Sequence, residues 1–199
     1  TRTASAKIMQ QLNNSPNVLG WSLDDDFEKG GGHLGEAIKK ADTNDEYINA
    51  TPTFLPTAYF DIYDLEVIDG RAWNDSIDNQ YNYDLIINES AARALGITDI
   101  KNERIQSKDR IMYSAYQDMS VNPSYNIVGV IKDCRVGHLS KKVVPTIYLY
   151  SEPILVHINP GTSLVIRYQE GKQREVIELL SKLRNEVSGD GELEYSFVK

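Results

Sequence analysis

Apolar positions recur along this chain with two different periods, and the period in use indicates the type of element. A four-residue spacing of apolar side chains that begins at Ala4 predicts a helix over residues 3–13. A second stripe of this kind, beginning at Val176, predicts a helix over residues 172–187, and Ser188-Gly189-Asp190-Gly191 is expected to end it.

Short apolar runs bounded by turn residues predict strands. The predicted strands cover residues 18–23, 47–51, 65–68, 85–87, 110–116, 125–131, 146–150, 164–168 and 193–198. Pro52 is expected to close the second strand, and Pro56 can open a short helix through Tyr63. Because strands and helices are interspersed without a regular βαβ repeat, the sequence predicts an α+β fold with two subdomains.

Several local signals agree with one another around residues 85–96. The apolar strand leads directly into Asn88, a natural helix N-cap, and Gly96 supplies a left-handed stop for the short helix that follows. Gly70 is likewise expected at a position with positive φ. Gly129 lies inside an apolar strand, which indicates either a close backbone approach or a bulge.

Composition excludes several classes of protein. The 199 residues are 41% hydrophobic and 25% charged, as in an ordinary folded domain, and a single cysteine cannot form an intramolecular disulfide. The net charge of -8 repels phosphate backbones and argues against nucleic acid as a partner. The charge is uneven, since residues 1–100 carry 7 basic and 17 acidic groups and residues 101–199 carry 14 and 12.

No run of 18 apolar residues occurs, so the sequence predicts no membrane span of its own. The chain also begins without an initiator methionine or a signal sequence. We therefore expect it to be a segment of a longer protein.

Motifs for cofactors and catalysis give no positive signal. Residues 30–35 read Gly-Gly-Gly-His-Leu-Gly and match G-x-G-x-x-G, but the acidic residues 24–28 stand where an apolar strand is needed, so a flexible loop is predicted. Those acidic residues also imitate the start of a calcium loop, yet Lys29 replaces the required glycine. Cys134 and His138 could be read as a nucleophile and a base, without any third group to orient them. We expect no cofactor, no metal and no catalysis.

Aromatic residues suggest one candidate binding patch. Trp73, Tyr81 and Tyr83 cluster with asparagine and aspartate residues, a composition that can stack on a sugar or contact a partner protein. This patch, which extends from Trp73 to Asp84, is the basis for an alternative prediction: an extracytoplasmic glycan- or protein-binding module.

Three separated stretches form a further pattern. They are Tyr59–Tyr63 with Leu65 and Gly70-Arg71, Ile86–Ala92 with Leu95-Gly96, and Tyr125–Asp133 with Pro145. In order and spacing these stretches resemble the extracytoplasmic core domain of ABC transporter permeases of the MacB and FtsX type, most closely across residues 59–148. The chain departs from the family pattern at residues 102–104, where a Gly-Lys pair is usual, and at Cys134, where an aromatic is usual.

The resemblance implies a division of the chain into two subdomains. Residues 1–70 and 146–199 would form a mixed α/β core, similar to the family's porter subdomain. Residues 71–145 would form an inserted β-rich subdomain, similar to its sabre subdomain. Such a domain performs no chemistry itself.

The resemblance also implies partners and a location. The expected partners are a cytoplasmic ABC ATPase that acts through membrane helices outside this chain, a second permease copy and an envelope protein or lipoprotein. The expected location is the bacterial inner membrane, with this segment exposed to the periplasm or cell exterior. The function implied is coupling of ATP hydrolysis to export or to mechanical signalling across the envelope.

Overall fold

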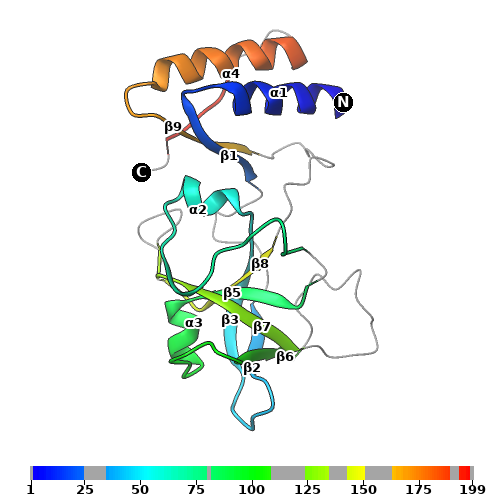
Figure 1. Ribbon diagram of the computed structural model, residues 1–199, viewed down its shortest axis with the longest axis vertical. Helices are drawn as coiled ribbons and strands as arrows, with labels where there is room; N and C mark the ends of the chain where they lie inside the picture. Colours follow the sequence, from blue (N-terminus) through cyan, green and yellow to red (C-terminus); the bar gives the residue numbers. More distant parts are fainter. Residues whose placement is uncertain are drawn as a thin grey trace. The chain divides into compact units, whose positions relative to one another are not determined.

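The computed structural model describes residues 2–24, 35–79, 82–108, 124–134, 143–150, 163–188 and 193–197 (Figure 1). The chain forms two compact units, of which unit 1 comprises residues 1–25 and 153–199 and unit 2 comprises residues 26–152. Helices and strands are mixed in chain order, so the predicted α+β class is confirmed.

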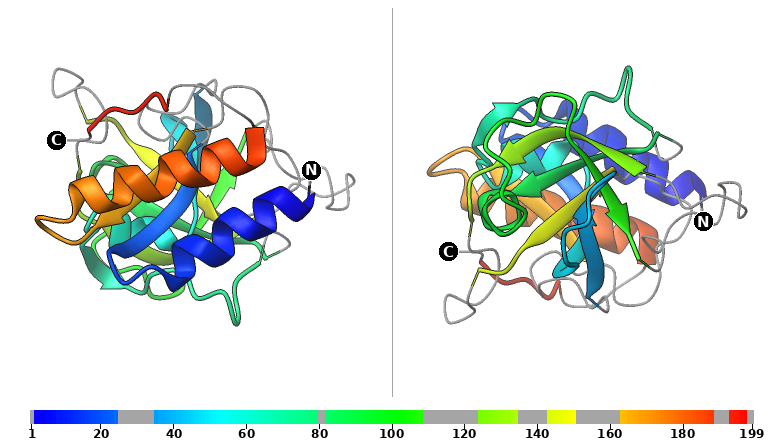
Figure 2. Two further views of the ribbon diagram at one scale, coloured as in Figure 1. Left: turned by 90° about the horizontal axis from the view of Figure 1, so that it is seen from above. Right: turned by 90° about the horizontal axis from the view of Figure 1, so that it is seen from below.

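The described part of unit 1 consists of two helices and a two-stranded sheet. Its elements are α1 (Arg2–Asn14), β1 (Val18–Asp24), β9 (Ser163–Tyr168) and α4 (Gln173–Ser188). The two helices run side by side in opposite directions, and β1 pairs with β9 in antiparallel fashion (Figures 1 and 2). The apolar stripes predicted from spacing are the buried ones, because Leu12, Val176 and Leu183 are among the most buried side chains of this unit.

An ion pair supports the contact between the two helices. Lys7 Nζ of α1 lies 2.6 Å from Glu186 Oε2 of α4. The lysine lowers the pKa of the Glu186 carboxyl below its ordinary value, although both groups are solvated and the pair adds little stability.

Unit 2 is built on a ring of strands. The elements are β2 (Glu36–Lys40), β3 (Ile48–Leu55), α2 (Ala58–Ile62), β4 (Val67–Gly70), β5 (Asp84–Asn88), α3 (Glu89–Ala94), β6 (Arg104–Ser107), β7 (Ser124–Ile131) and β8 (Thr146–Tyr150). The strand order β2–β3–β8–β5–β7–β6 closes because β6 pairs with both β7 and β2. Strand β4 adds to the second half of β7, beyond the part that β6 occupies.

The central strands of unit 2 are buried on both faces. Leu85 and Ile87 of β5 pack into one apolar cluster with helix α3, whereas Ile86 points into a second cluster that contains Tyr59 of helix α2. This explains why residues 85–87 form a continuous apolar run rather than an alternating one.

Gly129 lies next to a bulge and also at a close backbone approach, the two alternatives that the sequence indicated. The register between β5 and β7 shifts between Leu85 and Ile86, so β7 contains an irregularity next to this glycine. In addition, a Cβ atom at Gly129 would lie 2.2 Å from the backbone oxygen of Arg71, so no larger residue fits without movement of the backbone.

Two expectations differ from the structure. Strand β3 continues through Pro52 to Leu55, because β2 pairs only with the first part of β3 and the proline therefore interrupts no ladder on that side. Residues 193–197 form no strand. The two compact units divide the chain at 25/26 and 152/153, and within unit 2 the strands β2 and β4 pair with β6 and β7; the subdomain boundaries that the resemblance implies, at 70/71 and 145/146, stay a prediction.

Other predictions lie outside the described residues. These include the glycine-rich segment 30–34, the predicted strand at residues 110–116, and His138. Within the described helices, none is both long and apolar enough to cross a membrane.

Candidate functional site

Two aromatic residues of the predicted binding patch, Trp73 and Tyr83, pack into different apolar clusters. Trp73 is only 4% exposed, and its ring packs edge-on against Tyr150 with centroids 5.7 Å apart. Tyr83 packs edge-on against Tyr125 in the other apolar cluster, with centroids 5.9 Å apart. Tyr81 lies outside the described residues. The buried indole of Trp73 therefore has no exposed face on which a sugar could stack.

The segment that carries Trp73, residues 70–79, is a closely fastened loop that we call the Arg71 loop. It begins at Gly70, whose φ of 70° is the left-handed conformation expected for this glycine. The backbone N–H of Arg71 donates to the carbonyl oxygen of Val128 at 3.0 Å, which extends the pairing of β4 with β7. The next residues place the Trp73 ring in the second apolar cluster.

An ion pair between Arg71 and Asp78 joins the two ends of the Arg71 loop. Both terminal nitrogens of the Arg71 guanidinium donate to the Asp78 carboxylate, with Nη2 at 2.8 Å from Oδ1. The Asp78 side chain is 1% exposed, and its carboxylate also accepts the backbone N–H of Asn74 at 2.8 Å. Hydrogen bonding to Asp78 raises the pKa of Arg71 above its ordinary value, so the guanidinium stays charged.

The far end of the Arg71 loop is attached to two other elements. The Asp75 carboxylate accepts a hydrogen bond from the Tyr150 hydroxyl at 3.0 Å and another from the Thr57 hydroxyl. Loop residues are therefore bonded to β7, to the end of β8 and to the start of α2. Such a loop presents a fixed conformation rather than an adaptable one.

A second polar network, which we call the Asp133 joint, fixes helix α3. The Asp133 carboxylate accepts the backbone N–H of Ser90 at 2.9 Å, the Ser90 hydroxyl at 2.6 Å and Nη2 of Arg93 at 3.0 Å. In return, the backbone N–H of Asp133 donates to Glu89 Oε2 at 2.9 Å. The end of β7 is thereby bonded to the first turn of α3.

Asn88 completes this joint from the other side. Its Oδ1 atom accepts the N–H of Ala91 at 2.9 Å, which confirms the predicted N-cap, and also the N–H of Thr146 at 3.0 Å. Its Nδ2 atom donates to the Val144 carbonyl oxygen at 2.9 Å. One buried amide therefore joins the helix to the start of β8.

Cys134 does not have the surroundings of an activated nucleophile. It is half-buried, and burial raises the pKa of its thiol above the ordinary value. A nucleophilic cysteine requires the opposite shift, and the proposed base His138 lies outside the described residues. Among the side chains that the structure describes, no group of three or more metal-ligating residues comes together.

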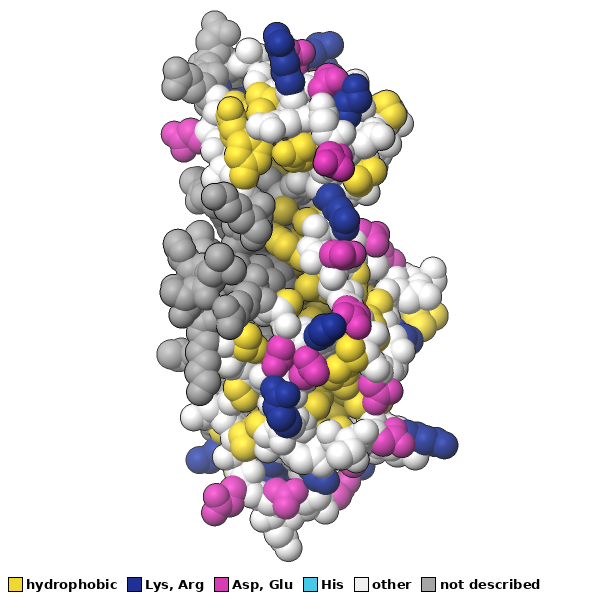
Figure 3. Space-filling model, turned by 90° about the vertical axis from the view of Figure 1, so that its left-hand side faces the viewer, with side chains coloured by type: hydrophobic (Ala, Val, Ile, Leu, Met, Phe, Trp, Pro, Cys, Tyr) yellow, Lys and Arg dark blue, Asp and Glu magenta, His cyan; other side chains and the backbone are white. Residues whose placement is uncertain are grey.

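The surface gives no single-sign charge pattern on the face shown in Figure 3. Basic and acidic side chains are interspersed over its described area, with apolar side chains between them. Neither a phosphate-binding basic stripe nor a large acidic field is present there.

Sequence reasoning found some parts of these networks and missed others. The helix cap at Asn88 and the positive φ at Gly70 could be predicted, because their local sequence signals are strong. The Arg71–Asp78 pair and the role of Asp133 were not, because these contacts depend on how separate segments meet.

Comparison with known proteins gives a consistent result only at the level of structure. No family model matches the chain, and no curated protein matches it significantly.

Three solved structures cover nearly the whole chain. The periplasmic region of MacB from Actinobacillus actinomycetemcomitans is 14% identical with a TM-score of 0.51, and the match covers 90% of this chain and 74% of that one. The extracellular domain of the noncanonic ABC-type transporter YknZ from Gram-positive bacteria is 13% identical with a TM-score of 0.54, covering 93% and 84%. A domain of a protein described as a permease from Porphyromonas gingivalis is 15% identical with a TM-score of 0.56, covering 90% and 75%. The chain therefore has the fold of the extracytoplasmic domains of MacB-type ABC transporter permeases.

Proposed function

We propose that this chain is the extracytoplasmic domain of an ABC transporter permease of the MacB and FtsX type. In this role it couples ATP hydrolysis by a cytoplasmic ATPase to export, or to mechanical signalling, across the cell envelope. The observation that supports the proposal is the fold likeness to three such domains over at least 90% of the chain.

The polar networks suit a domain that transmits movement. A body that passes on a shape change must resist deformation itself, and movement then occurs at its connections. In unit 2, the Arg71 loop and the Asp133 joint bond helices and loops to the ring of strands through buried or half-buried charged groups. These contacts stiffen unit 2 without providing a catalytic centre.

The proposal includes partners and a location. The chain would act within a permease dimer in the bacterial inner membrane, with this domain in the periplasm or at the cell exterior. The dimer would work with a cytoplasmic ABC ATPase and an envelope protein or lipoprotein. The domain itself would neither bind nor hydrolyse ATP.

The direct test is the reading frame on both sides of residues 1 and 199. A window of about 19 residues applied to the flanking sequence should find a membrane span on each side. Polar flanks on both sides would contradict the proposal.

A second test concerns nucleotide. Equilibrium dialysis of the purified chain with ATP and Mg²⁺ should show no saturable binding, with the partner ATPase as the positive control. Saturable binding by the chain itself would contradict the role proposed for it.

A further inference from the structure

Arg184, near the end of helix α4, carries a charged group that is partly buried. Its side chain is half-buried, and its Nη1 atom is buried without a hydrogen-bond partner among the described residues. A guanidinium always carries its positive charge and offers five N–H donors. Because burying a donor without an acceptor costs free energy, this atom is expected to meet an acceptor that the described structure does not supply.

The carboxylates of helix α4 are paired with other cations. The pairs are Lys172–Glu175, Arg174–Glu178 and Lys7–Glu186, with N···O distances of 2.8, 3.0 and 2.6 Å. Arg184 precedes Glu186 by two positions, which correspond to about 200° around a helix. Since Glu186 faces α1, Arg184 lies on the side of α4 that is away from α1.

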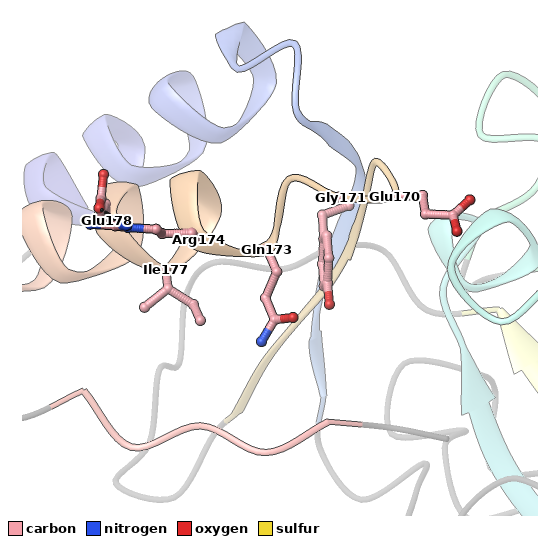
Figure 4. Close-up of a pocket in the computed structure, with 7 residues that line it drawn as sticks. Glu170, Gly171, Gln173, Arg174, Ile177 and Glu178 are labelled. Carbon is pink, nitrogen blue, oxygen red and sulfur yellow. Dashed lines mark hydrogen bonds and ion pairs between the residues drawn. The ribbon is translucent and has the colours of Figure 1, made fainter.

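The same side of α4 lines an open groove. Ile177 lies two turns before Arg184, and the groove is lined there by Ile177, Gln173 and Tyr168, the last residue of β9. Ile177 and Tyr168 are half-buried and give the groove apolar surface. Figure 4 shows the Ile177 and Gln173 side chains on one side of the helix and Glu178 on the other. The groove therefore continues the side on which Arg184 lies, and the paired Glu178 faces away from it.

The spacing of these groups defines the ligand that matches them. Ile177 and Arg184 are seven positions apart in the helix, a rise of about 10 Å. Three residues of an extended chain span about the same distance of 10 Å. A guanidinium pairs most strongly with a carboxylate, through two parallel N–H···O bonds. The matching ligand is thus an extended segment with an acidic and an apolar side chain three positions apart.

We propose that this side of α4 binds such a segment of a partner protein. The carboxylate of the segment pairs with Arg184, and its apolar side chain packs against Ile177 and Tyr168. Charge complementarity supports this occupant, because the carboxylates of α4 itself are already paired. The inference goes beyond the proposed function, since it assigns a binding surface to unit 1 whether or not the protein is a transporter subunit.

NMR titration of the nitrogen-15-labelled, 199-residue chain with two peptides tests this surface. The peptides are acetyl-Glu-Ser-Ser-Leu-amide and its reverse, acetyl-Leu-Ser-Ser-Glu-amide, because the groove residues define no direction for the segment. At least one peptide should shift the Arg184 Nε–H and the Ile177 amide signals along one common saturation curve. Its analogue with glutamine in place of glutamate should bind at least about tenfold more weakly, a change of about 1.4 kcal/mol. Equal binding of peptide and analogue, or no saturable shift with either peptide, would overturn the proposal.

Two variants on the same helix give a matched comparison. Arg184→Gln should abolish the shifts that the peptide induces, whereas Lys182→Gln, which removes an exposed charge two positions away, should leave the affinity unchanged. Arg184→Gln should also not lower the midpoint of thermal unfolding, because Nη1 has no hydrogen bond to lose in the free chain. Equal loss of binding in the two variants would show a nonspecific effect of charge and contradict the proposal.

Phosphatidylglycerol vesicles test the alternative ligand, an anionic lipid. Added to the complex of chain and peptide, they should displace no more peptide than phosphatidylcholine vesicles do. Displacement by phosphatidylglycerol vesicles alone would identify the lipid as the ligand of Arg184 and overturn the assignment to a partner protein.

Discussion

Removing Arg71 should destabilise unit 2 more than removing its partner Asp78. The two side chains differ in exposure, with 38% of the Arg71 side chain exposed and 1% of the Asp78 side chain. Loss of Arg71 leaves a carboxylate buried without its counter-charge. Loss of Asp78 leaves a guanidinium that water can still reach.

The structure sets the expected magnitudes. Breaking a buried pair costs about 3–5 kcal/mol. We expect about 3 kcal/mol for Arg71→Met, because Asp78 still accepts the N–H of Asn74. Methionine keeps the apolar stem of Arg71, so this variant isolates the charge. For Asp78→Ala we expect about 1.5–2 kcal/mol, in the lower part of the range of about 1.5–3 kcal/mol for a lost hydrogen bond to a charged group.

Urea denaturation followed by circular dichroism at pH 7 measures both values. The double variant Arg71→Met with Asp78→Asn provides the control, since asparagine is neutral and can still accept the N–H of Asn74. It should recover at least half of the stability lost in Arg71→Met alone. If Asp78→Ala proves the more costly single change, or if the double variant recovers nothing, the argument from unequal burial is refuted.

Three further predictions rest on single contacts. Gly129→Ala should lower the free energy of unfolding by about 3 kcal/mol, because the added Cβ overpacks against the Arg71 backbone. Gly96→Ala should lower it by only about 1 kcal/mol, the cost of a left-handed alanine, because its added Cβ meets nothing within 4 Å. Thermal unfolding of the two variants compares these values. Asn88→Ala should lower the free energy of unfolding by about 2–3 kcal/mol, more than the loss of an ordinary cap, because it also removes hydrogen bonds to the β8 segment. Urea unfolding of this variant, compared with that of Asn88→Asp, measures the difference. Cys134 should react with a disulfide reagent more slowly than a free thiol at pH 8, because burial raises its pKa and so lowers the thiolate fraction. The midpoint of its rate–pH profile should therefore lie above that of a free cysteine thiol measured with the same reagent.

Each of these predictions has a clear contrary result. Equal costs for the two glycine variants would mean that the backbone near Gly129 moves aside freely. A cost for Asn88→Ala near that of a simple cap would mean that the bonds to the β8 segment contribute nothing. Reaction of Cys134 at the rate of a free thiol would show that the thiol is not shielded in solution.

The sequence predicted best those features that depend on a few neighbouring residues. Asn88 caps the start of helix α3 and Gly96 follows its end, as expected, because a cap and a left-handed stop each act within one turn. The apolar run at 85–87 was identified as a buried strand from its lack of polar positions.

Features that depend on distant pairing were predicted less well. Pro52 was expected to end β3, but a proline is tolerated where the neighbouring strand has already stopped, and that depends on where β2 ends. Trp73 was expected at a surface because polar residues follow it. Trp73 is instead buried, in a loop whose Asp78 side chain points inward and pairs with Arg71.

The place of β8 in the ring has a consequence for the order in which the protein folds. This strand is the last of unit 2 along the chain, yet it lies between β3 and β5, with Thr51 opposite Thr146. The ring therefore cannot close until residue 150 is available, and contacts so distant in sequence make folding slow. The sheet of unit 1 needs β9, which comes later still, to pair with β1. When the chain is synthesised from its N-terminus, unit 2 can therefore fold first, and α1 and β1 have no pairing partner until β9 has been made.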